Sequence, residues 1–439
     1  MFVKPILLSV VATLSFPSHA GVFNRFTVGN KAETTIQQNN ECSLFEAIEN
    51  ANAASVVYTD CPAKSRIING RPNQNVVSLR KGATFAFDAA AINSDYALPE
   101  ITGRVIIQGT KQNKPIIRRI TTSETFTDAD WDAFYATFDD SLVRPGFAMI
   151  KVRNGGKLTL RNIQTTGFGN YQDGDDPNSI RNFGHVVPGG QVVDVEAGGR
   201  LIVANAALSS ISGAAVHSAG ITRLFDASIT STGNFGIGLD SDGMATVKGT
   251  TLSGNFTALA NSHRATVKNS ILRGGSIGLY TAPGAVSIVN NANLIFNGVA
   301  IDNEGKVVIR NSIISDNYGF NFQFAFFDPG VVVENNGVIV SQNNIWGDNT
   351  ILPAFDISIF ESFLFDHRFT PSSTDRVISQ LSPVAANIFD TNPDGSIRLP
   401  SNSPAVGFGN PTTCSDKNLV NERCDAGAVP HSLRYLISD

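Results

Sequence analysis

A short phrase returns six times between Gly198 and Asn317, and this repeat constrains the fold more than any other feature. The copies begin 20 to 23 residues apart, and each ends in Leu or Ile: VANAAL, LFDASI, VKGTTL, VKNSIL, VNNANL and IRNSII. A period of this length, built from short apolar runs and Asn, Gly and Ser turns, is typical of a solenoid. Because the phrase lacks a helical period of 3.6 residues, each repeat is predicted to be a coil of short β-strands.

Coils of this kind stack with their apolar residues pointing inward, about 4.8 Å apart. Three strands in each coil and parallel pairing between coils predict an all-β fold, a right-handed parallel β-helix with roughly 20–23 residues per coil. We expect the β-helix to span 65–350, after an N-terminal cap over 21–64 and before a C-terminal capping region over 351–439. The 39 glycines and the charged fraction of only 16% suit such a turn-rich protein.

The first 20 residues have the pattern of an export signal peptide. Lys4 precedes an apolar run from Ile6 to Phe16, and Ser18-His19-Ala20 forms a small-x-small cleavage site. The run is too short to span a bilayer, and no later stretch is long enough to form a transmembrane segment. We therefore expect a secreted or cell-surface protein, with the periplasm as the alternative location.

The four cysteines form two pairs that are local in sequence, Cys42 with Cys61 and Cys414 with Cys424. In an oxidising compartment this predicts two disulfides of short loop, one near each end of the mature chain. Four cysteines allow three connectivities, and sequence proximity alone favours this one. A zinc site is the alternative, but the spacings match no zinc module.

Residues 42–54 predict a short amphipathic helix. Ser43 and Glu46 have the spacing of a capping box. One side of the helix is apolar, formed by Leu44, Phe45, Ile48 and Ala51. Since the first coil of a solenoid would otherwise expose its core and its strand edges, we predict that this helix covers that end.

Two stretches, 121–145 and 169–185, interrupt the repeat and are predicted to leave the solenoid. Each could wall a groove or form a decorated surface loop. Asp173, Asp175 and Asp176 in the second stretch are a weak candidate calcium site, because Ca²⁺ prefers clustered oxygen ligands. Their spacing departs from the EF-hand loop, which favours a solvated acidic loop instead. We otherwise expect no cofactor.

The phrase carries an Asn or Asp two places after its start in most coils. Such residues favour a bend in the left-handed backbone region, and stacked amides can form a hydrogen-bonded ladder. We therefore interpret this set as structural: Asn162, Asn205, Asp226, Asn269, Asn291 and Asn311.

Polar residues recur at the end of the third strand of each coil. Alignment of AAVHS, IGLDS, ALANS, IGLYT and VAIDN predicts a column of His217, Asp240, Asn261, Tyr280 and Asp302. Two positions on, a second column contains Asp242, His263 and Glu304. Such a rib suits a sugar chain, because it repeats donors, acceptors and an aromatic ring along the axis. The alternative is that the strands end in polar turns; the predicted ligand-binding residues are His217, Asn261, Arg264, Tyr280, Asp302 and Glu304.

The same rib offers candidate catalytic residues, Asp240, Asp242 and His263. In an extended strand, carboxylates two residues apart are separated by about 7 Å, within the range of inverting glycosidases. Asp240 with Asp242 and Asp302 with Glu304 have this spacing. Asp242, one coil from His263, is the alternative acid/base pair, with Arg264 beside it to neutralise an acidic substrate.

Both ends of the chain resemble a known family. CSLFEAIENAN resembles the CSLREAI motif, with Phe45 in the position of its arginine, and SPAVGFGNPTTCSDKNLVNERCDAGAVP resembles the C-terminal pattern named choice-of-anchor Q. The resemblance covers both ends and most coils, and it implies a secreted or cell-surface right-handed parallel β-helix. It implies no settled activity and no catalytic residues. The coils are more distantly similar to those of polysaccharide lyases and pectin-degrading enzymes, an analogy of fold.

Three functions remain open. A net charge of −5 argues against nucleic acid, whose binding needs a basic stripe. The first function, which we favour, is a monomeric binding or adhesion protein that holds a glycan or a partner surface along its coils. The second is a polysaccharide lyase or glycoside hydrolase with its site on the His217–Glu304 rib. The rib is more acidic than basic, which favours neutral glycans; the third function is a structural spacer.

Overall fold

The computed structural model describes most coils and parts of both ends. The described residues are 20–29, 39–69, 73–88, 96–120, 148–168, 191–210, 213–232, 236–254, 256–315, 317, 332–347, 370–378, 388, 390–391, 397–413, 419–420 and 423–427. Outside these residues lie 1–19 of the predicted export signal, both predicted excursions with Asp173, Asp175 and Asp176, and Cys414. No helix in the described part of the chain is long and apolar enough to cross a membrane.

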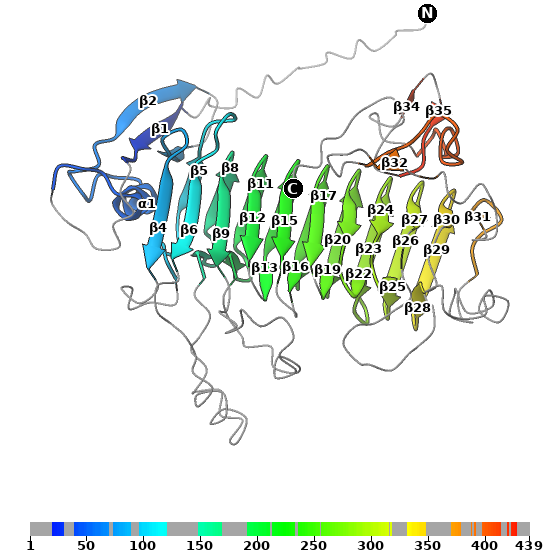
Figure 1. The fold of residues 1–439 in the computed structure, drawn as a ribbon. Coiled ribbons are helices and arrows are strands. Elements are labelled where there is room, and N and C mark those ends of the chain that lie inside the picture. Colours follow the sequence, from blue (N-terminus) through cyan, green and yellow to red (C-terminus); the bar gives the residue numbers. More distant parts are fainter. Residues whose placement is uncertain are drawn as a thin grey trace, which may run out of the picture.

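Three long sheets run side by side along the molecule (Figure 1). The twelve-stranded sheet has the order β2-β1-β3-β5-β8-β11-β14-β17-β20-β23-β26-β29. Its strands are β1 Ala20–Thr27, β2 Lys64–Asn69, β3 Gln74–Ser78, β5 Arg104–Gln108, β8 Lys157–Arg161, β11 Arg200–Ala204, β14 Ile221–Phe225, β17 Met244–Lys248, β20 Arg264–Lys268, β23 Val286–Asn290, β26 Lys306–Arg310 and β29 Val338–Gln342.

The second sheet has eight strands in the order β28-β25-β22-β19-β16-β13-β10-β7, and the third has eleven in the order β31-β30-β27-β24-β21-β18-β15-β12-β9-β6-β4. The eight-stranded sheet consists of β7 Ile150–Val152, β10 Val193–Val195, β13 Ala214–Ser218, β16 Ile237–Ser241, β19 Thr257–Asn261, β22 Ile277–Thr281, β25 Val299–Asn303 and β28 Val333–Asn335. The eleven-stranded sheet consists of β4 Thr84–Asp88, β6 Ile116–Ile120, β9 Gln164–Phe168, β12 Ala207–Ser210, β15 Ser228–Ser231, β18 Thr251–Gly254, β21 Ile271–Arg273, β24 Asn293–Ile295, β27 Ile313–Ser315, β30 Ile345–Gly347 and β31 Arg376–Ile378.

The fold is the predicted right-handed parallel β-helix. Each strand in the coils pairs in parallel with the equivalent strand of the next coil, so that Leu224 of β14 lies opposite Val247 of β17. Side chains alternate between buried and partly exposed along the strands, as in β8 and β11. The inward Leu, Ile and Val residues of all three sheets merge into one continuous core. Stacking the repeats is therefore what buries their apolar faces.

The asparagine turn is confirmed as a left-handed bend between the twelve-stranded and eleven-stranded sheets. Asn162, Asn205 and Asp226 have φ values of 55°, 49° and 48°. The amide of Asn205 donates to Asn162 Oδ1 at 2.8 Å, one rung of the expected ladder. Asn and Asp tolerate this backbone region better than other non-glycine residues, so the turn explains why they recur.

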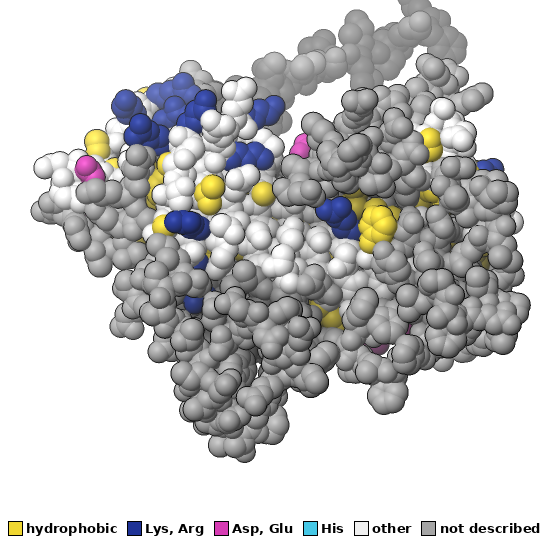
Figure 2. Space-filling model, in the orientation of Figure 1, with side chains coloured by type: hydrophobic (Ala, Val, Ile, Leu, Met, Phe, Trp, Pro, Cys, Tyr) yellow, Lys and Arg dark blue, Asp and Glu magenta, His cyan; other side chains and the backbone are white. Residues whose placement is uncertain are grey.

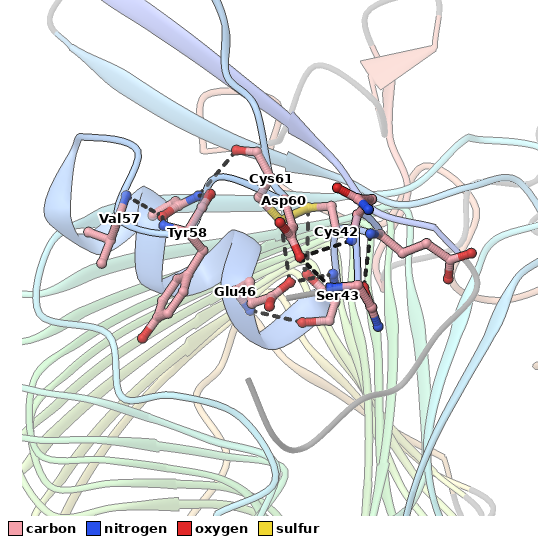
Figure 3. Close-up of a disulfide and its surroundings, with 11 residues drawn as sticks. Cys42, Ser43, Glu46, Val57, Tyr58, Asp60 and Cys61 are labelled. Carbon is pink, nitrogen blue, oxygen red and sulfur yellow. Dashed lines mark hydrogen bonds between the residues drawn. A yellow bond between two sulfur atoms is a disulfide. The ribbon is translucent and has the colours of Figure 1, made fainter. Parts of the chain in front are cut away.

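Helix α1, Leu44–Ala53, covers the first coils, and Figure 3 shows how it is held. The predicted capping box is present between Ser43 and Glu46. The predicted Cys42–Cys61 disulfide ties the start of the helix to the segment that follows it. Buried Asn50 accepts from the backbone N–H groups of Val57 and Tyr58 and donates to the carbonyl of Tyr58. Packing of α1 against β1, β3 and β5 therefore closes this end of the core.

The sequence did not predict the β1–β2 pair, which is antiparallel and extends the twelve-stranded sheet beyond its first coil. Lys64 and Arg66 lie on its outermost strand, where charge opposes pairing with other chains.

At the other end, C-terminal residues fold back over the coils. The carbonyl of Asp425 accepts from the Asn291 amide at 3.2 Å. The N–H of Gly427 donates to the carbonyl of Asn311 at 2.7 Å. Cys424 is in a disulfide. Two short antiparallel pairs lie in this region, β32 Asp390–Thr391 with β33 Ile397–Arg398, and β34 Leu419–Val420 with β35 Arg423–Cys424.

Candidate functional site

One line of residues crosses the eight-stranded sheet on its outer surface, and we call it the outer row. Its members are Cα partners on successive strands: Lys151, Asp194, His217, Asp240, Ala260, Tyr280, Asp302 and Glu334. They point away from the core because successive side chains of a strand alternate between its two faces. The row thus stands on the strand surface rather than in the turns. His217, Asp240, Tyr280 and Asp302 occupy it as predicted.

Asn261 does not belong to the outer row, and its predicted position is wrong. It pairs with Ser241 and Thr281, one residue further along the strand. Its buried amide donates to Ser287 Oγ at 2.9 Å and to the carbonyl of Val286 at 3.2 Å. A slip of one residue in register moves a side chain to the opposite face. Ala260 stands in the row instead.

His217 lies between two carboxylates and is the centre of the site. Its Nδ1 is 3.0 Å from Asp194 Oδ1, and its Nε2 is 3.4 Å from Asp242 Oδ2. The hydrogen bond with Asp194 and the charge of Asp240 outweigh the opposing effect of burial and raise the pKa of His217 to about 9. The imidazole is therefore protonated at neutral pH and donates from both nitrogens.

The partner of Asp242 is thus His217 and not the predicted His263. Met244 pairs with Arg264, which places His263 level with Gly243 in an exposed turn after β19. Arg264 is exposed at the start of β20, in the twelve-stranded sheet. Neither residue therefore joins the outer row.

Three residues that the sequence did not single out complete the surroundings of His217: Tyr96, Lys151 and Asp194. The phenol of Tyr96 donates to Asp194 Oδ2 at 3.2 Å, and Lys151 Nζ is 3.6 Å from the same oxygen. Burial would raise the pKa of Asp194, but the hydrogen bond and charge of His217 and the charge of Lys151 lower it. Burial and the charge of Asp194 raise the pKa of Tyr96, so the phenol keeps its proton. We call Tyr96, Lys151, Asp194, His217, Asp240 and Asp242 the His217 cluster.

Ion pairs anchor the edge of this cluster. Lys151 Nζ is 3.1 Å from Glu196 Oε1, and Arg153 contacts the same oxygen while binding Glu100 through two nitrogens at 2.6 and 2.7 Å. Bidentate pairs of this kind restrict the geometry of both partners. Glu196 therefore links Lys151 of the cluster to the bidentate Arg153–Glu100 pair.

Asp240 follows His217 in the outer row and carries a perturbed carboxyl group. Burial raises its pKa, the charge of Asp242 raises it further, and the charge of His217 opposes both. The site thus combines a protonated imidazole with a neighbouring carboxyl whose proton is held more tightly than usual. Such a pair of groups is a candidate for acid/base chemistry.

A second group lies further along the outer row, around Asp302. Burial, together with the charges of Glu334 and Glu304, raises the pKa of Asp302 to about 7. The phenol of Tyr280 donates to Glu304 Oε2 at 3.1 Å. The structure therefore brings together three of the predicted ligand-binding residues, Tyr280, Asp302 and Glu304. Among the described residues, no group of three or more His, Cys, Asp or Glu is arranged to hold a metal ion.

Comparison with known proteins adds little to this geometry. No protein-family model matches the chain, and no curated protein matches it. Among solved structures, the chain is similar to the A-module of the mannuronan C-5 epimerase AlgE6 from Azotobacter vinelandii, with 13% identity over 74% of this chain and 86% of that chain. The TM-score is 0.30, so the site must be interpreted from its own residues.

Proposed function

We propose that this protein binds a polysaccharide chain along the outer row of the eight-stranded sheet. The observation that carries the proposal is the outer row itself, which repeats polar side chains on successive coils at about 4.8 Å. The row offers cationic and phenolic donors, carboxylate acceptors and the ring of Tyr280, and Tyr96 beside it adds a second tyrosine ring. A sugar chain needs these groups, because its rings carry many hydroxyls and present apolar C–H faces.

Preorganisation also supports binding. The side chains of Lys151, Asp194 and His217 are 19%, 16% and 30% exposed, and each is held by ion pairs or hydrogen bonds. A ligand that meets side chains already fixed in place loses less conformational entropy on binding. A site of fixed donors and acceptors therefore favours specific over non-specific binding.

We infer that the protein acts outside the cell, at the cell surface or in the periplasm. The Cys42–Cys61 disulfide supports this location, because disulfides persist in oxidising compartments. The resemblance of the chain ends to the CSLREAI and choice-of-anchor Q patterns agrees with it. At such a location, polysaccharides are accessible ligands.

A polysaccharide lyase or glycoside hydrolase is the second candidate, favoured by the hydrogen-bonded series Tyr96, Asp194, His217 and Asp242. Protonated His217 suits a general acid or a donor to a developing negative charge, and Asp240 suits the partner base. Lys151 and Arg153 bring cations that sequence reasoning missed. Both cations are already paired with the carboxylates of Asp194, Glu196 and Glu100, so they do not shift the preference from neutral to acidic sugars.

The test is a screen of the purified mature protein against a panel of neutral and acidic polysaccharides. Retention and the release of new reducing or unsaturated ends are measured on the same samples. We expect retention of at least one polysaccharide, and His217→Gln should weaken it about tenfold, or ~1.4 kcal/mol, because a charged hydrogen-bond donor is lost. His263→Gln, an exposed histidine in a turn, is the matched control and should change affinity by less than about twofold.

The outcomes separate the candidates. Cleavage that disappears in His217→Gln or Asp240→Asn would establish the enzyme in place of simple binding. Equal loss in His217→Gln and His263→Gln would contradict the site on the outer row. If the protein neither retains nor cleaves any polysaccharide of the panel, the structural spacer is the remaining function.

A further inference from the structure

Charge is segregated between the faces of the β-helix. Although Asp and Glu outnumber Lys and Arg in the chain, 38 to 33, the twelve-stranded sheet contains no Asp or Glu in any strand. The eight-stranded sheet, by contrast, has Asp or Glu on four of its strands, β10, β16, β25 and β28. The Lys and Arg residues of the twelve-stranded sheet are Arg25, Lys64, Arg66, Arg104, Lys157, Arg161, Arg200, Arg223, Lys248, Arg264, Lys268, Lys306 and Arg310. Figure 2 shows Lys and Arg gathered over the end of the molecule that carries β1 and β2.

Three of these cations are stacked on consecutive coils, and we call them the cationic row. Arg104 is the Cα partner of Lys157, and Lys157 is the partner of Arg200. Arg223 lies on the next coil, two residues further along the strand direction. Strand spacing places the members of the row about 4.8 Å apart, an arrangement of like charges that is unfavourable unless an anion lies against it.

A hollow of about 260 Å³ opens at the cationic row. It is lined by Gln74, Arg104, Ile106, Lys157, Leu158, Thr159, Arg200, Leu201, Ile202, Ile221 and Arg223. Ile106, Ile202 and Ile221 are partly exposed between the cations. The hollow therefore combines an apolar floor with a charged rim.

The cations around the hollow have no anionic partner among the described residues. Arg104 donates to the neutral carbonyl of Asn73 at 3.5 Å, and no carboxylate contacts Lys157, Arg200 or Arg223 there. Arg200 and Arg223 are exposed, while Arg104 and Lys157 are half-buried. The positive potential of the row is therefore not neutralised by the described part of its own chain.

We propose that the cationic row binds a linear acidic polysaccharide lying along the β-helix axis. Its carboxylates or sulfates meet Arg104, Lys157 and Arg200, while the apolar faces of its sugar rings pack on Ile106 and Ile202. Charge complementarity carries the proposal, since a row of cations at strand spacing fits closely spaced anions on one chain. The hollow is too small to admit a nucleic acid duplex, but it suits a sugar ring. This site lies on a different sheet from the outer row and is independent of it.

The test measures the affinity of the full mature chain for polyuronate, heparin, neutral dextran and a short DNA duplex, each over a range of salt concentrations. The two acidic polysaccharides distinguish carboxylate from sulfate as the preferred anion. The test variant is Arg104→Gln/Lys157→Gln/Arg200→Gln. The control is Lys248→Gln/Lys268→Gln/Lys306→Gln, which makes the same change of net charge on the same sheet, outside the hollow. Circular dichroism confirms that both variants are folded.

We expect salt-dependent binding of at least one acidic polysaccharide and none of dextran. The test variant should lose about tenfold or more in affinity, and the slope of log affinity against log salt should shrink by about 2, because three ion contacts are removed. The control should stay within about twofold of the wild-type chain.

The proposal would be overturned by equal losses in the two triple variants, by binding of the DNA duplex as tight as that of the polysaccharides, or by the absence of salt-dependent binding. His217→Gln is measured in parallel. A loss seen only in His217→Gln would place the acidic polysaccharide on the eight-stranded sheet and contradict this site, whereas failure of the outer row alone leaves the cationic row intact.

Discussion

Asp194 is a central residue of the site that the sequence repeat did not predict. The repeated strand ends are recognisable in sequence only from AAVHS onward, so the first member that they predict is His217. Asp194 belongs to VVDV on the preceding coil, and the predicted excursion over 169–185 separates that coil from the one before it. The pattern of a buried aliphatic residue on either side of one polar residue, which β10 shares with β7, was the available signal. Tyr96 carries no repeat signal, because only an isolated bridge joins it to the sheet.

Asn261 illustrates a different limit. In TALAN, both Ala260 and Asn261 follow an apolar run, and a polar residue at a strand end fits the outer face by composition. The backbone register decides otherwise, since Thr257 begins the strand opposite Ile237. Sequence patterns specify which residues alternate, but a slip of one residue reverses every side chain.

At Asp302 the structure predicts a pH-dependent stability. Its carboxyl has a pKa of about 7 in the folded chain, against a usual value of 3.8, because of burial and of the charges of Glu334 and Glu304. The folded state therefore holds this proton more tightly than the unfolded state. Ionisation removes stability progressively as pH rises from about 4 to about 7, and the loss is complete above that range.

Asp302→Asn should therefore raise the melting temperature at pH 8 by about 2 °C or more, and it should change little at pH 4. Thermal unfolding of both proteins from pH 4 to 8 measures the difference. Asp226→Asn, at a turn position where other coils carry Asn, is the control and should keep the pH profile of the wild-type chain. An Asp302→Asn curve parallel to the wild-type curve would show that burial of Asp302 has no energetic effect.

At the scale of single elements, the repeat predicted most of what is observed. The short apolar runs form strands in the structure. The recurring Asn and Asp residues lie in left-handed turns, because they tolerate positive φ. The capping box and apolar side of 42–54 predicted α1 for reasons that lie within its own residues. The β1–β2 pair was missed because its antiparallel register joins residues that are distant in sequence, such as Phe23 and Arg66.

Helix α1 supplies a prediction at this scale. The Cys42–Cys61 bridge closes a loop with a sequence separation of 19 residues. Its removal by Cys42→Ser/Cys61→Ser should destabilise the capped end by about 3 kcal/mol. Amide hydrogen exchange in α1 should then accelerate by roughly 100-fold if its opening is local.

The control for this prediction lies in the same protein. Exchange in β19 and β22, on the central coils, should be unchanged in the double variant, because each coil contacts only its neighbours. Equal acceleration at both places would show that the solenoid opens as one unit, and no acceleration in α1 would show that the bridge does not hold the cap.

For the whole molecule, net charge proved to be a poor guide to its surfaces. The acidic composition and the acidic rib favoured neutral glycans and suggested no basic face. In the folded chain the charges are separated. Arg104, Lys157 and Arg200 lie in one row, and Asp194, Asp240 and Asp302 lie in another. The fold class followed from periodicity alone, whereas this segregation depends on which strand each charge occupies.

The two rows give one molecule two different surfaces. The outer row offers a mixed, hydrogen-bonded set of groups around His217, suited to recognition of particular sugars. The cationic row offers unneutralised charge, suited to holding an acidic chain through its repeated anions. A protein with both surfaces could hold a polysaccharide at one face while recognising its sugars at the other.

The central claim is that a polysaccharide lies along the outer row, and the most direct measurement is a crystal structure of the mature chain with an oligosaccharide retained in the panel. We predict sugar density across β7, β10, β13 and β16, with a ring beside Tyr96 and hydroxyl groups within hydrogen-bonding distance of His217 and Asp240. Density confined to another face, with the His217 cluster in contact only with solvent, would contradict the claim.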